Sequence, residues 1–184
     1  MKRELIIIVL LSLGILLFAC SEDDNVPYGP DYEIAGIKLD VDNSEYYRDT
    51  IPADVFKLKL TMLSDNDYAH QYGLNPNLTS KITDVQIMLG NHEGFPGIDS
   101  AEVNKYFVVD DGGSYDSLYE TIEQYTSKEK IKSLTPYLLF TNQTSLAAKA
   151  GKLVTDTVAV QLKVQLTLDN KKTFSKQVST VLIP

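Results

Sequence analysis

The chain has 184 residues, of which 17 are Lys or Arg and 25 are Asp or Glu, so its formal net charge is −8. Nucleic-acid binding requires a positively charged footprint, and this acidic composition argues against it. The single cysteine, Cys20, excludes disulfides within the chain and any zinc site built from several cysteines.

The first 19 residues have the pattern of a secretion signal. Lys2 and Arg3 precede an almost wholly apolar run at 5–18. This run is shorter than the about 20 residues that a membrane-spanning helix needs. A charged start before a short apolar run is typical of a signal peptide. We therefore expect residues 1–19 to be removed on export.

The end of the apolar run, Leu17-Phe18-Ala19-Cys20, resembles the lipobox of bacterial lipoproteins, with Phe18 bulkier than the usual residue. The resemblance implies that several acyl chains are attached at Cys20, which is what stable membrane anchoring requires. Residues 20–30 would then form a lipidated cysteine and a flexible acidic tether. Residues 21–25, SEDDN, also resemble the export signal of Bacteroidetes lipoproteins carried to the outer face of the outer membrane. An ordinary acidic tether would have the same composition.

Residues 31–184 have the size of a single domain, and apolar and polar residues alternate along much of it. This alternation, or a short apolar run, predicts strands at 35–41, 56–62, 85–89, 106–109 and 137–140. The clearest alternation is at 158–168, which a turn connects to a returning strand at 173–183. The C-terminus is therefore predicted to be a β-hairpin, and about seven strands are typical of an antiparallel β-sandwich.

One stretch has helical spacing instead. Its apolar residues are Tyr115, Leu118, Tyr119, Ile122 and Tyr125. Ser117 with Glu120, and Thr126 with Glu129, have the spacing of a capping box. We expect one or two short helices around 115–134, the first ending near Tyr125 and a second starting at Thr126.

The residues that enzymes and metal centres require are scarce or scattered. His70 and His92 lie in polar, turn-rich segments, and neither has a partner at the spacing of a metal motif. The sequence lacks a nucleophile elbow, a zincin motif and a phosphate-binding loop. No cofactor is predicted. Because carboxylates are numerous, a glycosidase-like pair stays an alternative that only coordinates can test.

Calcium is a weak alternative at one acidic segment. Asp110, Asp111 and Asp116 flank two glycines, and clustered carboxylate oxygens are ligands that calcium prefers. A solvated acidic turn would have the same sequence.

Two further patterns mark possible surface sites. Tyr68, His70 and Tyr72 lie in a long polar segment, and tyrosine rings with a polar tip suit contacts with protein or glycan. We predict a binding loop there. Separate Asp-Ser/Thr-aliphatic triplets resemble the O-glycosylation acceptors of exported Bacteroidetes proteins. These triplets predict modification at Thr50, Ser100, Ser117 and Thr157.

Together, the lipobox, the acidic stretch and the small β-rich domain are similar to uncharacterised Bacteroidetes outer-membrane surface lipoproteins with immunoglobulin-like domains. The similarity is specific for residues 1–25 and only architectural beyond them. It implies a mainly β protein, an antiparallel immunoglobulin-like sandwich, that acts as a non-enzymatic surface module binding a protein or glycan partner. The alternatives are a small polysaccharide-directed hydrolase and a structural lipoprotein of the envelope that faces the periplasm.

Overall fold

The computed structural model describes residues 31–42, 50–64, 77–90, 100–112, 119–129, 131, 133–141 and 153–184. These residues are mainly β-strands, as the alternation predicts. No helix within these ranges is long and apolar enough to cross a membrane. The predicted signal peptide and tether, 1–30, lie outside them.

A four-stranded sheet contains the C-terminal hairpin. Its order is β3 (Thr50–Pro52), β11 (Thr173–Ile183), β10 (Val158–Leu168) and β6 (Ile82–Leu89). The predicted hairpin is confirmed, because β10 and β11 pair antiparallel from Val158 opposite Leu182 to Thr167 opposite Thr173. β6 pairs antiparallel with β10, and the short β3 pairs parallel with β11.

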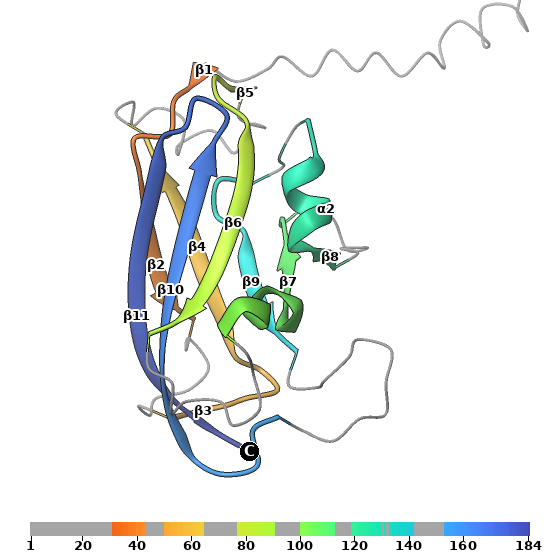
Figure 1. Cartoon of the computed structure of the whole chain (residues 1–184), viewed down its shortest axis with the longest axis vertical. Helices are drawn as coiled ribbons and strands as arrows, with labels where there is room; N and C mark the ends of the chain where they lie inside the picture. The colour runs from red at the N-terminus through yellow and green to blue at the C-terminus, as the bar shows by residue number, and fades with distance from the viewer. Residues whose placement is uncertain are drawn as a thin grey trace, which may run out of the picture.

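A five-stranded antiparallel sheet lies behind the first (Figure 1). Its order is β2 (Gly36–Val41), β4 (Lys57–Leu63), β9 (Tyr137–Phe140), β7 (Phe107–Asp110) and β8 (Glu120–Thr121). At one end of the molecule β1 (Asp31–Tyr32) pairs parallel with β5 (Asn77–Leu78).

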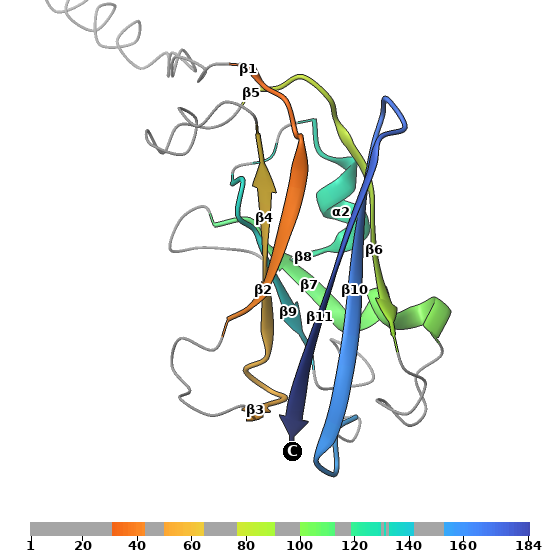
Figure 2. The ribbon, with the colours of Figure 1, turned by 90° about the vertical axis from the view of Figure 1, so that its left-hand side faces the viewer.

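The core lies between the two larger sheets, which Figure 2 shows from the side. Every second residue of β10 is buried from Val160 onward, and β4 buries Leu58, Leu60 and Met62 in the same way. The alternate residues face outward and are at least partly exposed on both strands. The alternation in the sequence thus identifies the side of each strand that is buried in the core.

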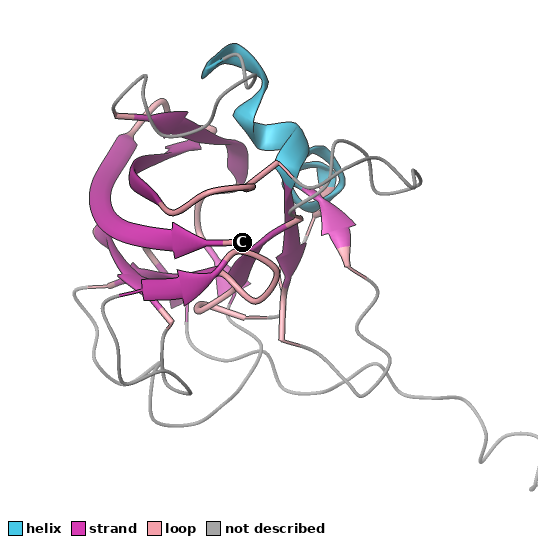
Figure 3. Ribbon diagram, turned by 90° about the horizontal axis from the view of Figure 1, so that it is seen from below, coloured by secondary structure: helices cyan, strands magenta, loops and turns pink. Residues whose placement is uncertain are grey.

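Two short helices lie on one side of the sandwich, next to β6 of one sheet and β7 of the other (Figure 3). The 3-10 helix η2 (Ser100–Tyr106) packs against β6 and β7, and α2 (Ile122–Ser127) packs against β6, β7 and β8. Val103, Ile122 and Tyr125 contribute buried side chains to the core from these helices.

The predicted start of the first helix was wrong. Glu120 and Thr121 form β8, paired with Val109 and Val108, and Tyr119 is 61% exposed rather than buried. The capping box uses Thr121 and Gln124, three residues further along than the predicted pair with Ser117. The Thr121 hydroxyl accepts from the Gln124 backbone N–H at 3.2 Å, and the Gln124 side chain accepts from the Thr121 N–H at 2.9 Å. These bonds satisfy donors that a helix start leaves unpaired.

The predicted second helix starting at Thr126 was also wrong. Thr126 and Ser127 complete α2, and their hydroxyls donate to the backbone oxygens of Glu123 and Gln124. Lys128 then adopts an extended conformation and ends the helix. Hydroxyl groups that bond back to the preceding turn compete with capping of a new helix.

Candidate functional site

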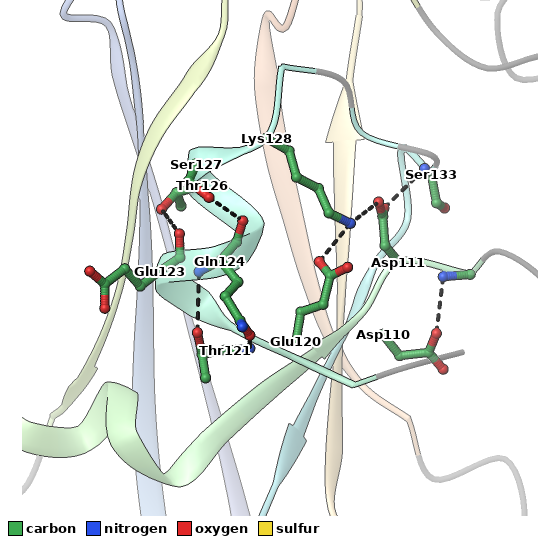
Figure 4. Close-up of polar contacts among 11 residues, drawn as sticks. Asp110, Asp111, Glu120, Thr121, Glu123, Gln124, Thr126, Ser127, Lys128 and Ser133 are labelled. Atoms are coloured by element: carbon green, nitrogen blue, oxygen red, sulfur yellow. Dashed lines mark hydrogen bonds and ion pairs between the residues drawn. The ribbon is translucent and has the colours of Figure 1, made fainter. Parts of the chain in front are cut away.

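A buried polar cluster joins α2 to the end of β7 (Figure 4). Asp111 is the charged residue that the structure buries among those it describes. One of its carboxylate oxygens accepts from the Ser133 backbone N–H at 3.0 Å, and the other lies 3.6 Å from the Lys128 ammonium. Lys128 also lies 2.6 Å from a carboxylate oxygen of Glu120. The ammonium of one lysine therefore neutralises two carboxylates from β8 and the end of β7.

Two of the three residues of the predicted calcium site, Asp110 and Asp111, are described. Asp110 points away from Asp111 and accepts from the Gly112 N–H at 3.0 Å (Figure 4). Gly112 has φ +70°, a conformation that favours glycine, so the two residues form a tight turn. Asp116 lies outside the described residues, which contain no group of three metal-binding side chains. The calcium site therefore stays a prediction from the sequence.

The cluster also differs from the carboxylate pair of a glycosidase. Such a pair faces a substrate and needs room for a sugar and a water molecule between its two groups. Asp111 and Glu120 instead share Lys128, and the Asp111 side chain is only 6% exposed. The arrangement is a structural ion-pair network that holds α2 against the sheet.

Tyr125 adds a buried phenol to this cluster. Its side chain is 1% exposed, and its hydroxyl has no hydrogen-bond partner in the structure as described. Burial, followed by the negative charges of Asp111 and Glu120, raises the pKa of this phenol well above its usual value. The phenol stays protonated and unpaired, which costs free energy in the folded state.

Tyr32 provides a matched comparison, since its buried hydroxyl donates to the Met62 backbone oxygen at 2.8 Å. We expect Tyr125→Phe to leave stability unchanged or raise it by about 1 kcal/mol, because no hydrogen bond is lost. Tyr32→Phe should lower stability by about 1–2 kcal/mol, because the Met62 oxygen loses its donor. Urea denaturation of both variants at neutral pH measures the difference. Equal losses in the two variants would contradict the structure.

The two phenols also predict an alkaline transition. Burial raises the pKa of Tyr32 to about 12, and the pKa of Tyr125 is raised too. Because folding favours the protonated phenols, their contribution is fully present below the ordinary pKa of 10.0 and is lost as the pH rises through the folded-state values. Tyr125→Phe should therefore lose less stability than the native chain above pH 10.0. An unchanged alkaline profile would contradict this assignment.

The outer side of the four-stranded sheet forms a second candidate site, which we call the polar face. It consists of outward side chains of β6, β10 and β11: Asp84, Gln86, Met88, Gln161, Lys163, Gln165, Thr167, Thr173, Ser175, Gln177 and Ser179, with Ala159 and Val181 on the same side beyond Gln161 and Ser179. All are exposed or half-buried. No described element lies in front of these strands in Figure 1. Within the described part of the chain, the polar face is uncovered.

Strand register arranges the polar face in rows. Gln86, Gln165 and Ser175 lie side by side across three strands, and Met88, Lys163 and Gln177 form the next row. Side chains on neighbouring strands are about 5 Å apart, so one row presents several amide and hydroxyl groups together. These groups both donate and accept hydrogen bonds. The face carries little charge although the whole chain is acidic.

The predicted binding loop of Tyr68, His70 and Tyr72 lies outside the described residues. The described residues on either side of it show where this segment begins and ends. Ser64 follows β4, and Asn77 in β5 pairs directly with Asp31, the first described residue. The described residues on both sides of this segment therefore lie at the end of the domain that contains Asp31, whereas the C-terminus lies at the opposite end (Figure 1).

The predicted modification sites fall in different environments. Thr157 is exposed and immediately precedes β10, whereas Thr50 is half-buried at the start of β3. Ser100 opens η2. Ser117 and the predicted lipidation site Cys20 lie outside the described residues. Of the two threonines, Thr157 is the more accessible to a modifying enzyme.

Two features of these sites were not singled out from the sequence. The alternation in β10 predicts that its glutamines point away from the core. It does not predict whether another part of the chain covers that side of the sheet. The sequence did not indicate the ion pairs of Lys128, because its partners Asp111 and Glu120 lie in other parts of the fold.

Comparison of the chain with protein-family models, with curated proteins and with solved structures found no match. The function is therefore argued from the residues and geometry of this chain alone.

Proposed function

We propose that this chain is a lipid-anchored, non-enzymatic module of the bacterial outer membrane that binds an uncharged glycan through the polar face. The observation that carries the proposal is the open face of amide and hydroxyl groups on β6, β10 and β11. The anchor is argued from the sequence of residues 1–25.

An immunoglobulin-like topology belongs to this proposal. In that fold, strands A, B, E and D form one sheet and C, F and G the other. If β2, β4, β6, β7, β9, β10 and β11 are strands A to G in chain order, the five-stranded sheet contains A-B-E-D and the four-stranded sheet contains G-F-C. This agreement in strand order supports an immunoglobulin-like topology. No disulfide joins the two sheets, because the chain has a single cysteine. The polar face is then the outer side of the C-F-G sheet.

The composition of the polar face favours a glycan over a protein. Energetically dominant residues at protein interfaces are most often Trp, Tyr and Arg, and none lies on this face. Its glutamines, serines and threonines instead match the hydroxyl groups of sugars, which also donate and accept hydrogen bonds. Lys163 is the one cation on the face, with Asp84 at its rim, so an uncharged partner suits it.

Affinity electrophoresis in gels containing a neutral glucan, xylan, mannan or galactan tests the proposed ligand class. We expect at least one polymer to retard the soluble domain, residues 21–184. The triple variant Gln86→Ala, Gln165→Ala and Gln177→Ala should weaken binding by about tenfold or more, since each lost hydrogen bond contributes about 0.5–1.5 kcal/mol. Thr61→Ala, on the outer side of β4, is the control that should bind normally. Equal mobility in all gels, or retardation that the triple variant retains, overturns the glycan proposal.

Localisation to the cell surface is the second part of the proposal. Protease treatment of intact cells should digest the domain while a periplasmic marker survives. A Cys20→Ser variant should lack the acyl chains and leave the membrane fraction. Digestion only after the outer membrane is broken would favour the periplasm-facing structural alternative.

A further inference from the structure

β6 is an edge strand whose open side is occupied by a side chain. One edge of β6 pairs with β10. No strand lies beside the other edge among the described elements. The side-chain amide of Asn104, in η2, lies there instead. Its nitrogen donates to the Val85 backbone oxygen at 2.9 Å, and its oxygen accepts from the Ile87 backbone N–H at 2.7 Å.

Asn104 therefore replaces part of a missing strand. Only one orientation of the amide places its donor on the Val85 oxygen and its acceptor on the Ile87 N–H. The two bonds satisfy backbone groups that a neighbouring strand would otherwise pair. Val103, 2% exposed and part of the core, fixes η2 beside the strand. The amide is thus held in place by the residue before it.

Open strand edges readily pair with other chains, and proteins usually protect them with Lys, Pro or a covering element. Residues 82–89 contain neither Lys nor Pro, and Asp84 is their single charge. The outward residues Gln86 and Met88 are uncharged, so Asp84 is the only charged group that two copies of β6 would bring together. Among the described residues, η2 and α2 pack against β6, and Asn104 supplies side-chain hydrogen bonds to the backbone of its outer edge.

We propose that Asn104 keeps the chain monomeric by occupying the edge of β6, and that the partner it excludes is β6 of a second copy. Two copies of one strand pair antiparallel about a two-fold axis, and the contact closes on itself. The four-stranded sheets of the two copies would then continue into one another. Their polar faces would form one wider surface. The proposal does not depend on what the polar face binds.

Sedimentation of the soluble domain over a wide range of concentrations tests this proposal. The native chain should remain monomeric, whereas Asn104→Ala should form a dimer whose fraction rises with concentration. The double variant Val103→Ala, Asn104→Ala also loosens η2 and should dimerise more strongly. Val160→Ala, which removes core volume from β10 without touching this edge, is the matched control for general destabilisation and should stay monomeric.

Hydrogen exchange at the Ile87 amide locates the contact. In dilute Asn104→Ala this amide should exchange about tenfold faster than in the native chain, because one hydrogen bond is lost. At high concentration the dimer should protect it again. If both Asn104 variants stay monomeric, or if they dimerise without renewed protection of Ile87, the proposal is overturned.

Discussion

Phe107→Ala is expected to produce the largest loss of stability among the changes considered, about 3–5 kcal/mol. Phe107 is 2% exposed and is one of three phenylalanines whose rings contact one another. Its ring centroid is 5.4 Å from that of Phe140 and 6.5 Å from that of Phe56, in tilted and edge-on geometries. Truncation removes both ring contacts and leaves a cavity. Urea denaturation measures the loss.

Phe107→Leu is the control for this prediction, because it keeps most of the apolar volume. Its loss should be smaller than that of the alanine variant, at about 1–2 kcal/mol. The three phenylalanines come from β7, the end of β9 and the residue before β4, so the cluster holds three parts of the five-stranded sheet together. A loss below about 1 kcal/mol for Phe107→Ala would contradict this packing.

Lys128→Met has the second largest expected effect, a loss of about 2–3 kcal/mol. The substitution keeps the side-chain stem but leaves the buried Asp111 carboxylate without its cation. We place the loss below that of a fully buried pair because the Lys128 and Glu120 side chains are 24% and 26% exposed, and solvent screens them. Thermal and urea unfolding measure it.

A double variant separates the charge from the packing. Asp111→Asn retains an oxygen for the Ser133 N–H and removes the charge. Combined with Lys128→Met, it should recover most of the stability lost in the single lysine variant, because the uncompensated charge is gone. No recovery would show that Lys128 acts through its contacts with the Tyr125 ring, whose centroid lies 6.0 Å from the ammonium.

The strands could be predicted from the sequence because burial on one side imposes a period of two. The predicted bounds of β9, β10 and β11 agree with the structure, and those of β2, β4 and β7 differ by one residue at either end. β6 begins earlier than predicted, at Ile82, since Thr83 and Asp84 interrupt the apolar pattern. A register irregularity between Thr167 and Leu168 lies opposite this interruption.

The helical segment was predicted less well because local signals competed. Ser117 with Glu120 and Thr121 with Gln124 have the same spacing, and the pairing of Glu120–Thr121 with β7 decided between them. This pairing joins residues more than ten positions apart, which local periodicity does not report. The contacts of Asn104 with β6 are equally non-local. The candidate sites therefore depended on tertiary structure more than the strands did.

The central claim, that the polar face binds a neutral glycan, is tested most directly by NMR. Oligosaccharides cut from the four neutral polysaccharides are titrated into the labelled soluble domain, and the side-chain amide signals of the glutamines are followed. We predict shifts at Gln86, Gln161, Gln165 and Gln177, with the residues around Asp31 and Asn77 unaffected. Shifts confined to that end of the domain, or no shifts with any of the oligosaccharides, would contradict the account.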